Sequence, residues 1–214
     1  MDGGSPGGIF LTPGGSFGSL HCRESGFKKV AEKVLLHLCC APCTIYPLGV
    51  LREEGHEVYG HFYNPNIHPF SEYKRRLDTV DTYAGGEKLG VTRENAYPLE
   101  EFLRQVVFRE EDRCRHCYRL RLAGTARMAK KGGFAAFTTT LLYSRFQKHD
   151  LIRSIGDAVA AAEGIPFLYR DFREGWSEGV RISKKLGMYR QQYCGCIYSE
   201  RDRFYPAPRS NPFN

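Results

Sequence analysis

The chain has 214 residues and a net charge of +7 at pH 7. This length suits one domain with a large core, and no apolar run is long enough to cross a membrane. The first 25 residues are rich in Gly, Ser and Pro and lack the order of charged and then apolar residues that marks a secretory signal. We therefore expect a cytoplasmic protein with a mobile tail at residues 1–27, a single α/β domain at 28–205 and a short tail at 206–214.

Short apolar segments alternate with amphipathic ones through the first half of the domain. The run that ends at Leu38 is followed at once by Cys39, Cys40 and Cys43, which suits a buried strand that leads into a loop. Val, Tyr and Phe mark the next strand, and capping residues or glycines mark the ends of helices. We predict strands at Lys29–Leu38, Glu57–Tyr63 and Val91–Tyr97, and helices at Thr44–Glu54, Ser71–Gly85 and Glu100–Phe108.

The second half of the domain continues in the same order. We predict helices from Cys117 to Lys131, from Leu151 to Glu163 and from Gly179 to Gly187, and strands at Phe134–Leu142 and Ile165–Arg170. Strands that alternate with helices predict a mostly parallel sheet with helices on both faces. The loops after the strands would then gather at the carboxyl edge of the sheet, where this architecture binds its ligands.

Seven of the eight cysteines are grouped, and Cys22 stands alone in the N-terminal tail. Without a secretory signal, clustered cysteines more often bind metal or do redox chemistry than form structural disulfides. Cys39, Cys40 and Cys43 follow the first strand, and Cys114 and Cys117 lie near the start of a helix. Four thiolates from two such groups can hold zinc or an iron–sulfur cluster. The adjacent Cys39–Cys40 pair is not a usual zinc spacing, which favours iron–sulfur and leaves zinc as the alternative.

A third group, Cys194-Gly-Cys196, places two thiols one residue apart. Such a pair can close a small, strained and easily reduced disulfide, with Gly195 supplying the backbone freedom. We favour a redox pair here, with two more metal ligands or plain surface thiols as alternatives. Asp150 and Asp171 follow two of the predicted strands and are candidate proton donors or ligands.

Positive charge is concentrated between Arg104 and Arg153, where twelve Lys or Arg stand against four Asp or Glu. Such a run is usually a solvated helix face, and it is also the pattern of a phosphate-binding surface. Tyr118, Tyr143 and Phe146 are interleaved with it, and aromatic rings can stack on unpaired bases. The sequence has no glycine-rich dinucleotide motif and no P-loop lysine, so it gives no support for ATP or dinucleotide binding.

Five motifs occur in order along the chain. They are Cys39-Cys-Ala-Pro-Cys43, Asp112-Arg-Cys-Arg-His-Cys-Tyr118, Thr138-Thr-Thr-Leu-Leu-Tyr-Ser144 with Gln147-Lys-His-Asp150, Asp171-Phe-Arg173, and Tyr189-Arg-Gln-Gln-Tyr-Cys-Gly-Cys196. Together they resemble the QueH family of epoxyqueuosine reductases, from about Lys29 to Ser199. The resemblance implies a Rossmann-like sheet of the adenine-nucleotide-hydrolase type.

The resemblance also implies an activity, which is cobalamin-independent reduction of epoxyqueuosine to queuosine at the wobble position of tRNA. The implied groups are a [4Fe-4S] cluster on Cys39, Cys40, Cys114 and Cys117, a redox-active disulfide between Cys194 and Cys196, and Cys43 as a ligand of an adjacent mononuclear iron. An unidentified electron donor would restore the dithiol. Two alternatives stay open: a zinc-stabilised RNA-binding module without catalysis, and a sulfur-transfer tRNA modification enzyme. The second would need ATP, and the pyrophosphatase loop for it is missing.

Overall fold

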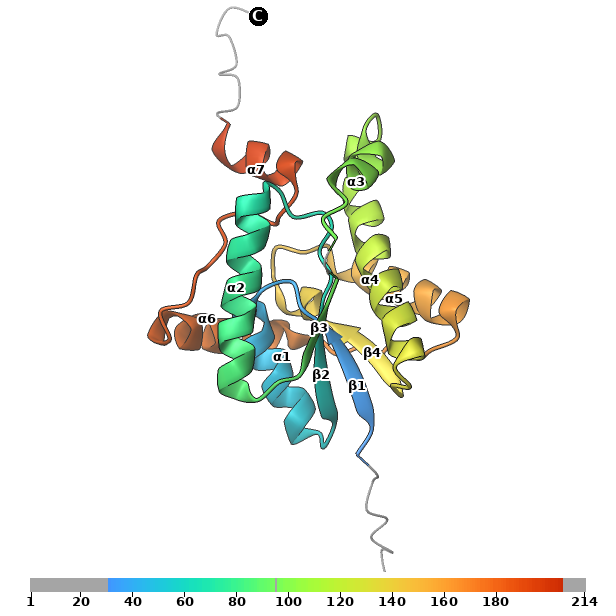
Figure 1. The fold of residues 1–214 in the computed structure, drawn as a ribbon, viewed down its shortest axis with the longest axis vertical. Helices are drawn as coiled ribbons and strands as arrows, with labels where there is room; N and C mark the ends of the chain where they lie inside the picture. Colours follow the sequence, from blue (N-terminus) through green and yellow to red (C-terminus); the bar gives the residue numbers. More distant parts are fainter. Residues whose placement is uncertain (1–30, 95, 206–214) are drawn as a thin grey trace, which may run out of the picture.

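The computed structural model describes residues 31–94 and 96–205, and its centre is a four-stranded sheet (Figure 1). The strands are β1 (Lys33–His37), β2 (Glu57–Phe62), β3 (Val91–Arg93) and β4 (Ala136–Thr139). They run in the order β3-β2-β1-β4, and every neighbouring pair is parallel. The predicted α/β class with a parallel sheet is confirmed. The tails predicted at 1–27 and 206–214 lie outside the described residues.

Strand β1 lies in the middle of the sheet and sets its register. It pairs with β2 from Lys33↔Glu57 to His37↔His61, and with β4 on its other side. Val34 and the two leucines that follow it are fully buried. A parallel strand that is covered on both faces needs apolar residues at successive positions, which explains the unbroken apolar run in the sequence.

Seven α-helices are found in the described part of the chain. They are α1 (Ala41–Glu53), α2 (Phe70–Glu87), α3 (Leu99–Val106), α4 (Arg113–Lys131), α5 (His149–Glu163), α6 (Trp176–Lys185) and α7 (Ile197–Phe204). Helices α1, α2 and α6 cover one side of the sheet, and α4 and α5 cover the other (Figure 1). None of the described helices has both the length and the apolar character that a membrane crossing requires.

The strand predicted at Ile165–Arg170 is wrong. Only Phe167 bridges to the sheet, opposite Phe137 of β4. The amide of Phe137 donates to the Pro166 carbonyl at 3.0 Å, and the Leu168 amide donates to the Phe137 carbonyl at 2.8 Å. Pro166 has no amide hydrogen to continue the ladder, so this segment remains a single bridge at the edge of the sheet.

Strand β4 is shorter than the predicted Phe134–Leu142, and its end shapes the site. The Thr139 hydroxyl accepts a hydrogen bond from the Leu141 amide at 3.1 Å. This cap turns the chain into a 3-10 helix, η2 (Thr140–Tyr143), directly beyond the carboxyl edge of the sheet. The residues after β4 therefore turn toward α1 and the loop that precedes it.

Two helix boundaries and one unpredicted helix change where the cysteines lie. Helix α1 begins at Ala41, so Cys43 lies on its first turn. Helix α4 begins at Arg113, so Cys114 and Cys117 are three residues apart on one helix. Helix α7 follows Cys196 directly and was not predicted, because no apolar period marks this short polar segment.

Candidate functional site

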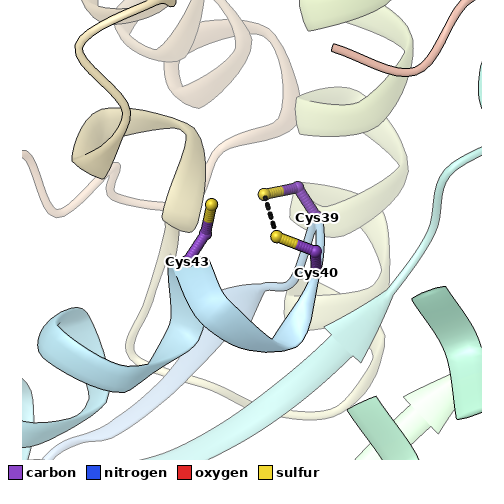
Figure 2. Close-up of side chains that lie close together, drawn as sticks. All are labelled: Cys39, Cys40 and Cys43. Carbon is purple, nitrogen blue, oxygen red and sulfur yellow. Dashed lines mark hydrogen bonds between the residues drawn. The ribbon is translucent and has the colours of Figure 1, made fainter. Parts of the chain in front are cut away.

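Three thiols meet where β1 ends. The chain leaves the sheet after His37, and α1 begins at Ala41 with a proline in its first turn. The sulfur atoms of Cys39, Cys40 and Cys43 all lie within 4.8 Å of one another, and all three side chains are buried (Figure 2). We call this group the sulfur cup. Such a set of soft donors is suited to iron or zinc.

The three sulfur atoms are not equivalent. Hydrogen bonds within the cup, from Cys40 and Cys43, lower the pKa of Cys39 well below its ordinary value. The Cys39 sulfur also accepts a hydrogen bond from the Thr140 hydroxyl at 3.1 Å. Burial raises the pKa of Cys40 to about 12, and the bond to Cys39 raises the pKa of Cys43. Cys39 is therefore the most acidic thiol of the cup, and metal binding would displace the protons that the cup sulfurs hold.

The second cysteine pair is not part of the cup. Among the described residues, neither Cys114 nor Cys117 belongs to the group of sulfur atoms within 4.8 Å of one another. Burial raises the pKa of Cys117 to about 12, and the nearby sulfurs of Cys194 and Cys196 act in the same direction. The structure thus brings the Cys114–Cys117 pair close to the Cys194-Gly-Cys196 segment.

Arg121 lies between the two sulfur groups and is 1% exposed. Its Nη1 donates to the Cys117 sulfur at 3.7 Å, and its Nη2 donates to the Asn64 side-chain oxygen. Its Nε lies 3.3 Å from Nε2 of His37. None of these partners is a carboxylate. Burial opposes the charged form, yet the sulfurs of Cys117 and Cys39 raise the pKa of Arg121 above its ordinary value.

A segment near the C-terminus, residues 189–196, closes over the cup; we call it the strap. Within it, the Gln191 amide donates to the Cys40 sulfur at 3.0 Å. Cys194 is exposed, and its sulfur accepts from the Gln147 amide at 3.2 Å. The oxygen of that amide in turn accepts a hydrogen bond from the Tyr118 hydroxyl at 2.8 Å. Both predicted redox cysteines therefore lie on a segment that is held against the sulfur sites.

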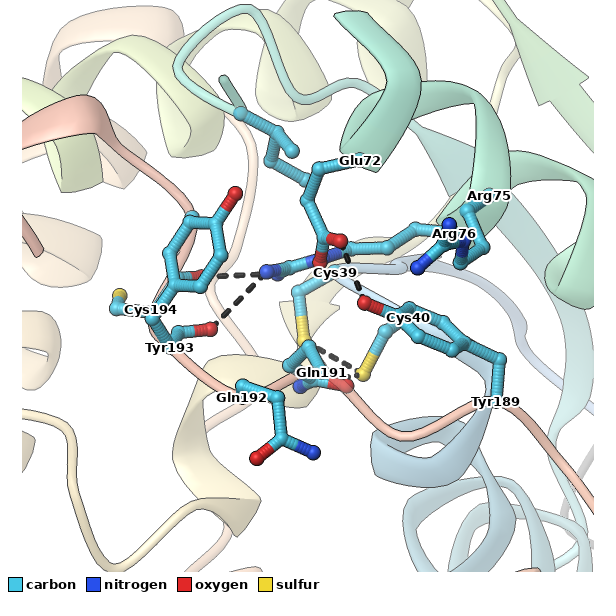
Figure 3. A network of polar contacts seen from close by, with 12 residues as sticks. Cys39, Cys40, Glu72, Arg75, Arg76, Tyr189, Gln191, Gln192, Tyr193 and Cys194 are labelled. Carbon is cyan, nitrogen blue, oxygen red and sulfur yellow. Dashed lines mark hydrogen bonds and ion pairs between the residues drawn. The ribbon is translucent and has the colours of Figure 1, made fainter. Parts of the chain in front are cut away.

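A buried ion pair on α2 anchors the strap (Figure 3). Arg76 is 1% exposed, and its Nε donates to Glu72 at 2.7 Å. Its two terminal nitrogens donate to the backbone carbonyls of Cys194, at 2.8 Å, and Tyr193, at 3.0 Å. The other carboxylate oxygen of Glu72 accepts from the Tyr189 hydroxyl. One guanidinium therefore ties the first and last parts of the domain together at the site.

Gly195 is required between the two strap cysteines. Its φ is +150°, a backbone conformation that side chains disfavour. A Cβ atom there would lie 3.1 Å from Ile67 and 3.5 Å from Arg76. Both strap cysteines are thiols in this structure, as are the five other cysteines that it describes. The disulfide that the resemblance implies is therefore absent from the described residues.

A cavity of about 690 Å³ opens beside the cup and the strap. Its lining includes Cys39 and Cys43 from the cup and Cys194 from the strap. Basic and aromatic side chains complete the wall; they are Arg76, Arg121, Arg190, Arg203, Tyr143, Phe146, Trp176 and Tyr193. A cavity with cysteine sulfur and several cations in its lining suits an anionic substrate.

Asp171 is placed differently from the other predicted site residues. Its carboxylate caps a short 3-10 helix and pairs with Arg173. Hydrogen bonds from Arg173 lower the pKa of Asp171 to about 2. The carboxyl group is therefore ionised at neutral pH, and it does not line the cavity. Asp150 lies on the first turn of α5 and is exposed.

The structure also corrects the surface expected from the sequence. Arg121, part of the predicted basic window, is buried and is not available to phosphate. Tyr143, named as a base-stacking ring, is only 2% exposed. Sequence analysis missed Glu72, Arg76 and Gln191, whose separation along the chain hides their contacts. A buried i, i+4 ion pair has the same spacing as a solvated one, so the sequence held no signal for it.

Comparison with known proteins places the chain in one family. A family described as epoxyqueuosine reductase QueH matches residues 34–202. Curated proteins named epoxyqueuosine reductase QueH are 39% identical in Dehalococcoides mccartyi, 38% in Thermotoga maritima and 34% in Streptococcus pyogenes serotype M1. The aligned regions cover 82%, 79% and 81% of this chain, and 96%, 91% and 72% of those relatives.

Proposed function

The chain belongs to the epoxyqueuosine reductase QueH family of oxidoreductases, and we propose that it reduces epoxyqueuosine to queuosine at the wobble position of tRNA. The observation that carries the proposal is the buried sulfur cup beside a cavity with a cationic wall. The cup offers soft ligands, and the cavity offers an anion-binding wall. A polyanionic RNA loop with a reducible base is the substrate class that uses both.

The residues present fit an iron–sulfur group. Arg121 is a buried cation whose side-chain partners in the described structure include no carboxylate, so anionic sulfur nearby stabilises its charge. We propose that Cys39, Cys40, Cys114 and Cys117 hold a [4Fe-4S] cluster and that Cys43 binds an adjacent iron. Bound there, the cluster would carry electrons singly, and the iron would act as a Lewis acid toward the epoxide oxygen.

The strap cysteines supply the electron pair in this proposal. Reducing an epoxide to an alkene breaks both C–O bonds, consumes two electrons and two protons, and releases water. Oxidation of the Cys194–Cys196 dithiol to a disulfide releases two electrons and two protons, so the step balances. Cys194 is exposed to the cavity and would react first, while Cys196 is buried beneath it. An external donor then reduces the disulfide.

A tyrosine is the better proton donor. The low pKa of Asp171 leaves that carboxylate without a proton to give at neutral pH. Burial raises the pKa of Tyr143, which lines the cavity, and the neighbouring sulfurs of Cys43 and Cys40 act in the same direction. Its phenol stays protonated, and its hydroxyl donates to the Trp176 carbonyl at 3.0 Å. Exchanging that acceptor for a departing alkoxide, which is a stronger base, would deliver the proton. We therefore assign the proton transfer to Tyr143 in preference to Asp171.

The metal content tests the proposal. Anaerobically purified protein should contain about four or more irons per chain with matching acid-labile sulfide. It should also convert epoxyqueuosine in tRNA to queuosine when an artificial reductant is present. Zinc without sulfide, together with no conversion, would establish the zinc-stabilised RNA-binding module instead. If the protein contains iron and sulfide but does not convert epoxyqueuosine, the proposed cluster stands and the proposed substrate is refuted.

Two variants separate the parts of the mechanism. Cys196→Ser should keep the iron and sulfide content but complete at most one turnover, because the disulfide cannot close. Multiple turnover by this variant would remove the redox pair from the mechanism. Tyr143→Phe should also keep its iron and lose most of its turnover rate, on the order of 10²-fold for a missing general acid. Asp171→Asn is the matched control and should turn over normally.

A further inference from the structure

Phe146 is a large apolar side chain that the fold leaves in solvent. Its side chain is 85% exposed, although burying a phenylalanine stabilises a folded protein by about 1.5–3 kcal/mol. Single exposed apolar residues are common and carry no meaning by themselves. This ring, however, lies on the wall of the cavity that contains the sulfur cup. A ligand that enters the cavity would therefore pass within contact distance of the ring.

The ring is part of an ordered aromatic array. Phe146 meets Trp176 edge to face, with ring centroids 5.5 Å apart and planes at 82°. Trp176 packs in turn on buried Tyr143, with centroids 5.2 Å apart. A neighbour on one side leaves the other face of a ring open, and Phe146 keeps 85% of its surface exposed. The array therefore presents a flat, uncovered aromatic surface at the cavity.

The backbone that carries the ring is fixed. The Phe146 amide donates to the Ser144 hydroxyl at 3.3 Å, and the Gln147 amide donates to the Ser144 carbonyl at 3.2 Å. The side chain of Gln147, the next residue, binds the Cys194 sulfur. The exposed ring is thus directly adjacent in the chain to the contact that positions the proposed redox thiol. A pre-ordered ring loses little conformational entropy when a partner binds.

The charges nearby identify the partner. Arg190 and Arg203 also line this cavity, and Arg145 precedes the ring and is exposed. A flat aromatic face beside several guanidinium groups matches a nucleobase whose own phosphates carry negative charge. Bases inside a duplex keep their faces covered by neighbours, so only an unpaired base can use the ring.

We propose that Phe146 is the stacking platform for an unpaired base of an RNA loop, and that it seats the loop so that one base enters the cavity. This rests on the proposed function, because it takes the tRNA anticodon loop as the substrate. Phe146 is a specificity-determining residue in this role: it selects single-stranded loops over paired stems.

The test compares four variants in the full-length protein. Phe146→Ala removes the ring, Phe146→Leu keeps apolar bulk without a π face, and Phe146→Tyr keeps the face. Phe108→Ala is the matched control, because Phe108 is 93% exposed and lies outside the lining of this cavity. The probes are a labelled synthetic RNA stem-loop with an unpaired loop and a fully paired RNA of equal length.

Two measurements report on binding. Fluorescence anisotropy of the labelled RNA gives the dissociation constant. Intrinsic tryptophan fluorescence shows whether the RNA binds near Phe146, because Trp176 is the single tryptophan of the chain and touches Phe146. Binding of the stem-loop to the wild-type and control proteins should change the tryptophan signal.

Phe146→Ala and Phe146→Leu should each weaken stem-loop binding by about 5- to 150-fold, the effect of losing one stacked base. Phe146→Tyr and Phe108→Ala should stay within about twofold of wild type, and paired RNA should not discriminate among the variants. Equal stem-loop affinity for wild type and Phe146→Leu would overturn the stacking platform while leaving the reductase intact. Wild-type protein that does not bind the stem-loop would overturn both.

Discussion

Replacing Arg76 with methionine would remove the guanidinium that ties helix α2 to the strap. The arginine is 1% exposed and has three hydrogen-bond acceptors: the Glu72 carboxylate and the carbonyls of Tyr193 and Cys194. Methionine fills a similar length without any donor. The variant therefore leaves Glu72 as a buried carboxylate that keeps only the Tyr189 hydroxyl as a hydrogen-bond donor at its side chain among the described residues.

The size of the effect follows from these contacts. Breaking a buried ion pair by removing one partner costs about 3–5 kcal/mol, because the other charge is left uncompensated. With a urea m-value of about 2 kcal/mol/M, the midpoint of unfolding should fall by roughly 2 M. Adding Glu72→Gln to Arg76→Met removes the stranded charge and should recover part of this loss. The remainder, about 1.5–3 kcal/mol, would measure the lost hydrogen bonds to the strap.

Urea denaturation followed by circular dichroism measures the stability, and thiol labelling measures the strap. Cys196 is 8% exposed and should react faster with a thiol reagent once Arg76 no longer holds the strap. Arg75→Met is the matched control: Arg75 is exposed and contributes one cation–π contact to Tyr189, at 4.9 Å. Arg75→Met should lower the unfolding free energy by at most about 1 kcal/mol. Equal midpoints and equal Cys196 labelling for the Arg76 and Arg75 variants would refute the anchoring role.

Three further outcomes test other parts of the structure. Gly195→Ala should destabilise the protein by about 1–3 kcal/mol and expose the strap, because the added Cβ meets neighbouring side chains at a φ of +150°. Gly187→Ala is the control, because Gly187 has a φ of +61° and open space around it, and it should lower the unfolding free energy less. Equal urea midpoints for the Gly195 and Gly187 variants would contradict the steric argument. Burial lowers the pKa of both His61 and His68 to about 4, so the unfolded chain binds protons that the folded chain does not. The unfolding free energy should therefore fall as the pH drops below about 6.5, by about 2 kcal/mol per histidine at pH 5, and urea midpoints that are equal at pH 7 and pH 5 would refute this. Arg119→Glu, on the exposed face of α4, should weaken RNA binding. The slope of the logarithm of the binding constant against the logarithm of the salt concentration should become shallower by about the contribution of one phosphate contact. An unchanged slope would mean that this face of α4 is only solvated.

The central strand and its cysteines could be predicted because local chemistry decides them. An apolar run cut off by cysteines and Pro42 has few options other than a buried strand that leads into a helix start. The Ile165–Arg170 segment has the same apolar character, yet it forms a single bridge at Phe167. Pro166 was the signal against this strand, because a proline has no amide hydrogen for a sheet ladder, and the prediction gave it too little weight.

The cysteine groups could be predicted as chemistry but not as geometry. Spacing along the chain put Cys43 in a loop, whereas a helix that starts at Ala41 turns its sulfur toward Cys39 and Cys40. Arg121 was counted with the basic surface, because α4 presents arginine on several of its sides. Tertiary packing decides which of those sides is buried, and no pattern of residues on one helix specifies it.

The two buried arginines at the site differ in how their charges are balanced. Arg76 has a carboxylate partner, Glu72, so the two side chains together carry no net charge whether or not the cup is ionised. Arg121 has an amide, an imidazole and a thiol as its partners. The energy of its buried charge therefore depends on the ionisation of nearby sulfur, and Cys39 is the cup thiol whose pKa is lowered. One arginine holds the strap in place, and the other lies among the sulfurs of Cys117 and the cup. Because Gln191 of the strap donates to the Cys40 sulfur, movement of the strap would change the hydrogen bonds that the cup receives.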